Sequence, residues 1–471
     1  MLKGQKLSYY SYGNYYKSTA EVFYPDSIAQ IEELMAIAKN KKRQITVAGS
    51  FHSFDNQNSG NDMVVSMKKI NYIRYNPDHT IDVGPGATWG DILKEAYKHK
   101  CVPFITITGS RPTAGGTLSA HTNTVFTPGL GKEGKYCLEF DLLTPDLGLL
   151  TCSRTQNQDL FYGVISGFGL LGFITRIKYK LCYVGSDYLI KISVKNYQDV
   201  KELEQRFDLR ETPDPVLPED LKSQSSLFYF DNNKPKFAIF DRHYVKTAQL
   251  QQHFNINLYI AAILTVIIRF FPKFANSIMI KDEKREPRKK VILKGLERIY
   301  YGTFWAEPDY LWMKYVSKLL KPFGYKPLLY QNSYFIPLAG DQITRFTQKT
   351  CELLLKYKLH TSMFDIMYIP KDEPFVLSSS RYTGGFYINT TFFDRTNKES
   401  LMKFYSELNH LCLEMNGKMN LVKNLFIETS LLEKMYENEI KEMLVLKKRV
   451  DKDNLIMSNF FKEKFPSTFG I

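Results

Sequence analysis

The sequence lacks closely spaced cysteines. Its six cysteines are spread from residue 101 to residue 412, and no two of them form a Cys-x-x-Cys pair. Zinc sites and disulfide frameworks depend on such clustering, so this distribution argues against both and favours a reducing compartment. A secretory signal peptide is also missing, because the first residues are polar and rich in tyrosine. We therefore expect no metal site and a cytoplasmic location.

The chain also lacks an apolar run long enough to cross a bilayer. Residues 256–268 are largely apolar and lead into Arg269, two phenylalanines and Pro272. A membrane-spanning helix needs about 20 such residues. Two interpretations of segment 256–272 stay open: a buried helix, or an interfacial helix that contacts the inner face of a membrane peripherally, assisted by Arg269 and Lys273.

Neither an internal repeat nor a low-complexity linker divides the 471 residues, and this length suggests two domains. The basic residues outnumber the acidic ones, 63 to 49, which gives a net charge of +14. Such an excess fits nucleic acid, an anionic membrane or a phosphorylated substrate. The basic residues are scattered apart from runs at 281–290 and 447–449, which we interpret as solvated surface. We expect no nucleic-acid partner.

Strand-like and helix-like segments alternate in the first third of the chain. Strands are predicted at 45–48, 63–67 and 80–84, and a helix at 89–100. This alternation is typical of an α+β or α/β nucleotide-binding unit. From about 185 to 420 the strands become rich in tyrosine and phenylalanine, which indicates a second domain.

Three segments rich in small residues stand out. The first, 45–60, runs from an apolar strand through Gly-Ser-Phe-His-Ser; the second, 107–123, contains Thr-Ala-Gly-Gly-Thr-Leu; the third, 163–176, contains Gly-Leu-Leu-Gly-Phe-Ile-Thr. Small residues let the backbone approach a ligand closely, and turns of this kind hold phosphate. In the third segment the glycines follow a helix and precede a strand, the reverse of the nicotinamide dinucleotide fingerprint.

In this order and spacing the three segments resemble the FAD-binding domain of the vanillyl-alcohol-oxidase flavoprotein family. The resemblance implies an α+β, two-domain flavoprotein. Its FAD-binding domain would cover residues 1–184, an inserted substrate domain on an antiparallel sheet would cover 185–415, and residues 416–471 would return to the first domain.

The resemblance also implies a set of cofactor-binding residues. The second loop would hold the FAD diphosphate and ribityl chain through backbone amides and hydroxyl groups. Ile174 would contact the adenine or pack in the core. The predicted cofactor residues are Ala48, Gly49, Ser50, Phe51, His52, Ser53, Phe54, Gly109, Ser110, Thr113, Gly115, Gly116, Ala120, Asn123, Gly172, Ile174 and Asn420.

Two branches of the family compete. Aldonolactone and alditol oxidases carry Gly-x-Gly-His-Ser, with a histidine that bonds FAD covalently, and a C-terminal His-Trp-Gly-Lys. This chain keeps His52, has Phe51 in place of the middle glycine and lacks the C-terminal motif. Residues 55–60 and the segment around Lys423 are instead similar to the decaprenylphosphoryl-ribose 2-oxidase branch of the bacterial cell envelope. That branch oxidises a polyprenyl-phosphate sugar, and a reductase partner completes the epimerisation.

Lys423 and His52 are the candidate catalytic residues. Lys423 would contact the substrate hydroxyl, either as a cation that stabilises an alkoxide or as a base with a lowered pKa. His52 is a covalent flavin ligand, a non-covalent neighbour or a structural residue. Gln331 and Asn389, on predicted strands, would bind the sugar. Asn123 and Asn424 depart from the second branch, where His-Gly and Lys-Asp are usual, so a flavin-binding module without turnover is a further alternative.

Overall fold

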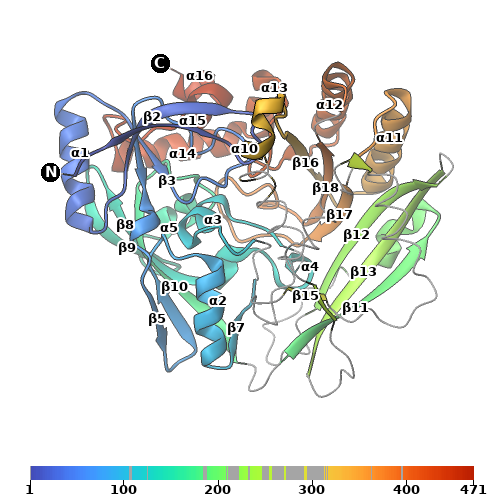
Figure 1. Ribbon diagram of the computed structural model, residues 1–471, viewed down its shortest axis with the longest axis horizontal. Coiled ribbons are helices and arrows are strands. Elements are labelled where there is room, and N and C mark those ends of the chain that lie inside the picture. The colour runs from blue at the N-terminus through green and yellow to red at the C-terminus, as the bar shows by residue number, and fades with distance from the viewer. Residues whose placement is uncertain are drawn as a thin grey trace.

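The computed structural model describes residues 2–105, 109–124, 126–183, 188–207, 209, 222–231, 234–246, 254–256, 270–271, 291–293, 312, 315, 317–361, 363–393 and 396–470. Helices and strands are mixed within this part of the chain, which confirms the α+β class. Figure 1 shows the early residues and the C-terminal helices together on one side of the molecule and the aromatic-rich strands on the other.

The first sheet has the order β1-β2-β4-β3. Its strands β2, β4 and β3 are parallel, whereas β1 pairs with β2 antiparallel. The connecting helix buries Ile31, Leu34 and Ala38, which are three and four residues apart and so share one face. The predicted strands at 45–48 and 63–67 are confirmed. The elements are β1 (Gln5–Tyr10), β2 (Lys17–Phe23), α1 (Ile28–Asn40), β3 (Ile45–Ala48) and β4 (Met63–Ser66).

A second sheet has the order β5-β6-β10-β8-β9, and β7 also pairs with β10. The helix α2 begins after Thr88, whose side chain accepts a hydrogen bond from the Asp91 amide. The predicted strand at 80–84 and helix at 89–100 are confirmed. The elements are β5 (Ile73–Asn76), β6 (Thr80–Val83), α2 (Trp89–Lys98), β7 (Cys101–Pro103), α3 (Ala114–Ala120), α4 (Thr127–Leu130), β8 (Cys137–Thr144), β9 (Gly148–Ser153), α5 (Gln158–Val164) and β10 (Phe173–Tyr183).

The third sheet has seven strands, all antiparallel, in the order β11-β13-β12-β17-β18-β16-β19. Two helices, α11 and α12, pack on one face, where Tyr334 contacts Phe346 and donates to Asn409. The elements are β11 (Tyr188–Tyr197), α6 (Leu203–Arg206), β12 (Lys222–Asp231), β13 (Lys234–Lys246), the short pair β14 (Phe254–Ile256) and β15 (Val291–Leu293), α10 (Ser317–Leu320), β16 (Leu329–Pro337), α11 (Gln342–Lys356), β17 (Met363–Ile369), β18 (Gly385–Phe393), α12 (Lys398–Glu414) and β19 (Lys418–Met419).

The predicted return segment 416–471 starts with β19, which still pairs with β16 of the third sheet. The chain then reaches the first sheet, where Ile456 bridges Ile45. The helical stretch in this segment is interrupted at Tyr436, whose hydroxyl donates to the Met419 carbonyl. The helices are α13 (Thr429–Met435), α14 (Glu437–Val450), α15 (Asn459–Lys464) and α16 (Pro466–Phe469).

A buried polar network joins the two sides of the molecule. His121 follows α3, and its Nε2 donates to Asp372, which lies after β17, at 2.6 Å. The Nδ1 of His121 accepts from the Gly134 amide, so this histidine is a neutral donor–acceptor link. Lys132 contacts the same carboxylate at 3.1 Å. Burial alone would raise the pKa of Asp372, but His121 and Lys132 hold it below its usual range.

The apolar segment 256–272 lies outside the described residues except at Ile256, Phe270 and Phe271. Both interpretations of it therefore remain predictions. Within the part of the chain that the structure describes, no helix is long and apolar enough to cross a membrane, and no cluster of three metal-ligating side chains occurs.

Replacing Lys447 tests how the C-terminal helices stabilise the part of the molecule that they share with the early residues of the chain. Its buried Nζ donates to Asp451 at 2.6 Å and to the carbonyls of Leu170 and Ile456. Lys447→Met keeps the stem and leaves a buried carboxylate uncompensated, so the free energy of unfolding should fall by about 3 kcal/mol. Chemical denaturation measures it. Lys448→Met, at the exposed neighbour, should change stability by less than about 0.5 kcal/mol; equal losses would contradict the assignment.

Candidate functional site

A cavity of about 360 Å³ lies between the first two sheets and the C-terminal loop. The three glycine-rich segments meet there. Most of the predicted cofactor residues line it: Ala48, Gly49, Ser50, Phe51, His52, Ser53, Phe54, Gly109, Thr113, Gly115, Gly116, Ala120, Asn123, Gly172 and Ile174.

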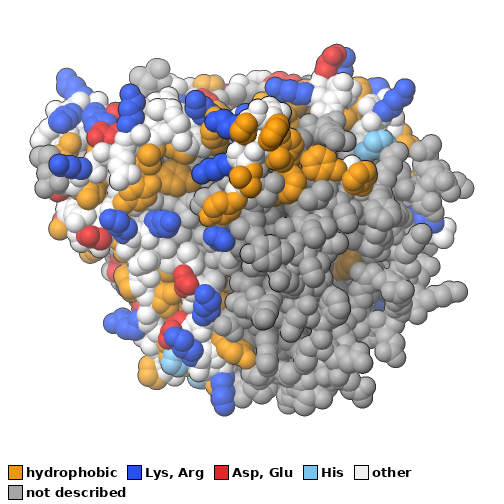
Figure 2. All heavy atoms as spheres, viewed as in Figure 1, with side chains coloured by type: hydrophobic (Ala, Val, Ile, Leu, Met, Phe, Trp, Pro, Cys, Tyr) orange, Lys and Arg blue, Asp and Glu red, His pale blue; other side chains and the backbone are white. Residues whose placement is uncertain are grey.

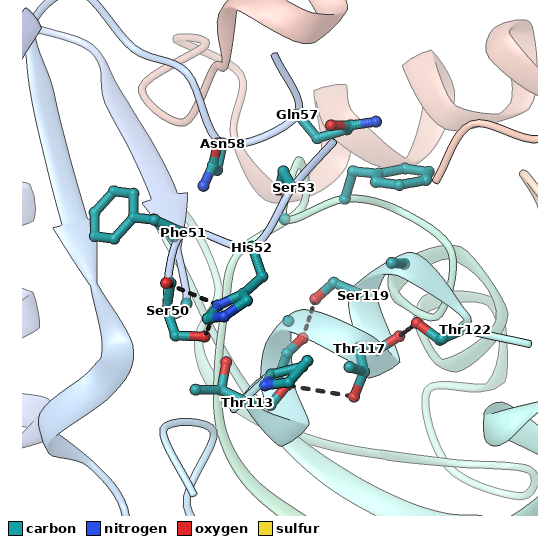
Figure 3. Close-up of a pocket in the computed structure, with 18 of the residues that line it drawn as sticks. Ser50, Phe51, His52, Ser53, Gln57, Asn58, Thr113, Thr117, Ser119 and Thr122 are labelled. Carbon is teal, nitrogen blue, oxygen red and sulfur yellow. Dashed lines mark hydrogen bonds between the residues drawn. The ribbon is translucent and has the colours of Figure 1, made fainter. Parts of the chain in front are cut away.

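The first loop leaves the end of β3 and places His52 in the cavity wall (Figure 3). Its Nδ1 lies 3.0 Å from the Ser50 carbonyl and 2.9 Å from the Ser50 hydroxyl. A proton on Nδ1 is needed to bond the carbonyl, and this tautomer carries its lone pair on Nε2. Phe51 adopts a left-handed conformation with φ 59°, as the glycine that it replaces would. Its ring packs on Tyr9, 4.8 Å between centroids, which offsets the backbone strain.

The first and second loops approach each other too closely for a side chain at Gly49. A Cβ added there would lie 2.4 Å from Oγ1 of Thr113. Thr113 is only 2% exposed, and its hydroxyl has no hydrogen-bond partner among the described residues. An unsatisfied buried hydroxyl costs stability unless a ligand pairs with it. Thr113 is therefore a strong candidate for a direct ligand contact.

The hydrogen-bonding groups of the second loop are used differently from the prediction. The Gly115 amide donates to the Pro85 carbonyl at 2.9 Å, so it cannot donate to a diphosphate. The Ser119 and Thr122 hydroxyls donate to the carbonyls of Gly115 and Thr117, which closes the turns of α3 (Figure 3). Their oxygens remain as acceptors. The expected cradle of free amides and donor hydroxyls was wrong at these positions, because the Gly115 amide bonds Pro85 and the two hydroxyls bond carbonyls of α3.

The third segment passes close to strand β8 at Gly172. Gly172 has φ 154°, and a Cβ on it would meet the Leu143 carbonyl at 2.6 Å. Ile174, two residues into β10, is buried and lines the cavity. A flat apolar wall of this kind suits a planar ring.

The C-terminal loop is bound to the first loop by buried hydrogen bonds. The Gln57 side chain donates to the carbonyls of Leu421 and Lys423, at 2.7 and 3.2 Å. The Asn424 side chain donates to the Phe54 carbonyl and accepts from the Gln331 amide, both at 2.9 Å. An aspartate at 424 could not make the first of these bonds. The departure from Lys-Asp thus has a structural role.

This loop positions Lys423, whose Nζ lies 4.2 Å from the centre of the Phe54 ring. Burial lowers the pKa of Lys423 to about 8, and the negative charge of Asp365 opposes that change. Burial in turn raises the pKa of Asp365 to about 6, against a hydrogen bond from Asn389 and the charge of Lys423. Of this pair, Lys423 lines the cavity, and both groups have a pKa shifted toward neutrality.

Four predicted residues do not line the cavity. The Ser110 carbonyl accepts from the Gly90 amide. Asn420 is buried, bonds Ser333 and accepts from the Val422 amide, so it shapes the turn before Lys423. Gln331 donates to Thr391 at 2.9 Å, and Asn389 donates to Asp365 at 2.7 Å. Gln331 and Asn389 share one face of the third sheet. Asn389 is the direct cross-strand partner of both Ser333 and Asp365, and Gln331 lies two residues from Ser333 on the same strand.

Asp365 was missed in the sequence. Its signal was a single carboxylate in the apolar strand Met363–Ile369. Further residues of the lining were not predicted individually as cofactor contacts: Tyr12, Gln57, Asn58, Arg111, Phe168 and Gly169.

The cavity fits FAD. Among the described residues that line it, none is acidic, whereas Arg111 and Lys423 are basic. Such a lining favours a ligand with phosphate groups. The Thr113 hydroxyl supplies an unsatisfied polar group in the cavity wall.

Comparison with known proteins also indicates an FAD-binding domain. Residues 19–153 match the family described as FAD binding domain. Cytokinin dehydrogenase 2 of Arabidopsis thaliana is 35% identical over 163 residues, 33% of this chain and 32% of that protein. Cytokinin dehydrogenase 7 of Oryza sativa subsp. japonica is 28% identical over 173 residues, again 33% and 32%. The chain thus matches about a third of the length of these relatives.

Residues 19–153 form an FAD-binding domain, and FAD is the cofactor. The similarity supports an FAD-dependent oxidoreductase and does not extend to the decaprenylphosphoryl-ribose branch.

Replacing Thr113 by valine tests the cavity as the FAD site. The change keeps the shape and removes the unpaired hydroxyl. Losing one hydrogen bond of about 1 kcal/mol should weaken FAD binding roughly fivefold. Flavin titration of the apoprotein measures this, in a His52→Ala background so that a covalent bond cannot mask the effect. Thr155→Val, at an exposed position, is the control; unchanged affinity in Thr113→Val would refute the contact.

Proposed function

We propose that this chain is an FAD-dependent oxidoreductase that dehydrogenates a secondary alcohol of a sugar or of a lipid-linked, polyprenyl-phosphate sugar. The observation that carries the proposal is Lys423, an amine with a pKa lowered to about 8 in the wall of the FAD cavity. An amine of this pKa is well matched to accept a hydroxyl proton near neutral pH.

The sheet behind Lys423 supports a hydroxylated substrate. Asp365 offers a carboxylate, and the side-chain oxygen of the buried Asn389 has no hydrogen-bond partner among the described residues. Both are acceptors, so they suit a ligand that presents several donors, as a sugar does. Gln331, two residues along β16 from Ser333, extends this polar face.

The chemistry divides between the chain and its cofactor. Bound FAD would supply the hydride acceptor. The neutral amine of Lys423 takes the proton of the substrate hydroxyl, and Asp365 stabilises the ammonium group that forms. Asn420 and Asn424 hold the turn in which Lys423 lies, so they position the base without touching the substrate.

The location and partners follow from the substrate. A lipid-linked sugar requires the protein to reach a membrane surface peripherally, with segment 256–272 as one contact. A reductase partner would complete an epimerisation.

A soluble aldonolactone or alditol oxidase is the second candidate, and the tautomer of His52 favours it, because with Nδ1 protonated toward Ser50 the unprotonated nitrogen is Nε2, as a covalent flavin bond through that atom requires. A flavin-binding module without turnover is the alternative of another class.

Spectroscopy of the purified protein tests the function. A flavin spectrum is expected, and anaerobic addition of polyprenyl-phosphoryl ribose should bleach it. Xylitol, galactonolactone and a cytokinin serve as competing substrates. Bleaching by one of these instead would replace the proposed substrate, and no bleaching by any of them would favour the silent module. Colour that stays in an acid precipitate, and is lost in His52→Ala, would establish the covalent bond.

The pH dependence of kcat/KM tests the role of Lys423. Below its pKa of about 8 the amine is protonated and cannot act as a base, so kcat/KM should rise with pH and level off above about 8. Lys423→Arg keeps the positive charge, removes the base and should lower kcat/KM at least about a hundredfold. Full activity in Lys423→Arg would assign a purely electrostatic role.

Replacing Asp365 by asparagine should shift the pH dependence of kcat/KM, which tests the coupling of Asp365 to Lys423. The carboxylate raises the pKa of Lys423, so its removal should move the rise in kcat/KM to lower pH. Asp241→Asn, whose carboxylate bonds Gln224 on another strand pair, should leave the profile unchanged.

A further inference from the structure

The short helix α10 and the turn that follows it expose large apolar side chains. Phe323 is 84% and Leu319 75% exposed, and they are the two most exposed large apolar residues of the described chain. Tyr315 and Phe271 are also exposed. Figure 2 shows apolar side chains gathered over α10, with basic side chains at their border. We name Tyr315, Lys318, Leu319, Lys321 and Phe323 the α10 surface.

Among the described residues, no acidic side chain neutralises the lysines of this surface or the neighbouring Lys326. Lys318, Lys321 and Lys326 are exposed, and none of the described residues forms an ion pair with them. Lysines on other helices pair with a glutamate one turn away, as Lys403 does with Glu399. Residues 310–340 contain four lysines and neither aspartate nor glutamate. An apolar cluster bordered by uncompensated positive charge is complementary to an anionic lipid surface.

Tyrosines border the same region. The Lys326 Nζ lies 5.5 Å from the ring centre of Tyr10, which is 42% exposed. The side chain of Asn14 donates to the Pro327 carbonyl, so the turn between β1 and β2 adjoins the segment after α10. Tyrosine and lysine are the side chains that gather where a bilayer meets water.

The inner side of α10 covers a wall of the FAD cavity. Leu320 packs in a cluster with Trp312, Leu329, Tyr12 and Phe54. Tyr12 and Phe54 also line the cavity. Leu319 therefore lies on an outward apolar face of the helix, and Leu320 lies on the opposite face, which packs against the wall of the cavity.

We propose that the α10 surface docks the protein on an anionic lipid bilayer. Leu319 and Phe323 enter the headgroup region while Lys318 and Lys321 contact lipid phosphates. The inference rests on the proposed function in one respect, since a lipid-linked sugar would then approach the cavity from the membrane. It names a surface other than segment 256–272 for this contact.

Cosedimentation of the full-length, FAD-loaded protein with vesicles tests the proposal. Binding is expected to vesicles of phosphatidylcholine with phosphatidylglycerol, to be weaker without phosphatidylglycerol, and to fall with salt. The double variant Leu319→Ser/Phe323→Ser should lose at least about tenfold in affinity, and Lys318→Glu/Lys321→Glu a similar factor. The control Val445→Ser, 69% exposed on α14, should bind as the unaltered protein does. An unchanged flavin spectrum verifies that each variant is folded.

Equal binding by the variants and the unaltered protein, or no binding by the latter, would overturn the proposal. So would a dimer that Leu319→Ser/Phe323→Ser dissociates in the absence of lipid, because the surface would then serve a second copy. Anaerobic bleaching of the flavin separates the two hypotheses. Vesicle binding without bleaching by any sugar contradicts only the proposed function, and bleaching without vesicle binding contradicts only the docking.

Discussion

The site depends on hydrogen bonds between two loops that lie more than 360 residues apart in sequence. Gln57 and Asn424 each bond main-chain groups of the opposite loop, and Asp55 accepts from the Leu425 amide at 2.8 Å. These partners are buried, so their loss would leave unsatisfied polar groups away from water. The bonds fix the turn that carries Lys423 relative to the loop that carries His52, and the wall of the FAD cavity exists only when both loops are in place.

The cofactor half of the site could be predicted from the sequence because it is local. Each glycine-rich segment carries its own strand and turn, and the order of the three was sufficient to find most of the lining. The details that failed concern competition for hydrogen bonds. Gly115 looked like a free amide, but its partner Pro85 lies thirty residues earlier, and no local pattern shows such a pairing.

The proposed substrate-binding residues were harder to predict because their arrangement depends on register across strands. Asn389 was found as a polar residue on a strand, whereas Asp365 was not, although the two side chains are bonded in the structure. Their meeting depends on the pairing of β17 with β18, and a shift by one residue would send Asp365 to the opposite face of the sheet. At the break between α13 and α14, the Tyr436 hydroxyl likewise bonds a distant carbonyl, that of Met419, a contact that helical periodicity alone could not reveal.

The antiparallel sheet is tethered at both of its ends to the part of the chain that holds FAD: β10 leads into β11, and β19 leads into the loop of Lys423. A sheet held at both ends in this way behaves as an exchangeable cassette. Strands far from the tethers can diverge, while the loop of Lys423 keeps its place beside the FAD cavity. The limited extent of similarity to the cytokinin dehydrogenases, about a third of each chain, is what such separate rates of divergence would leave behind.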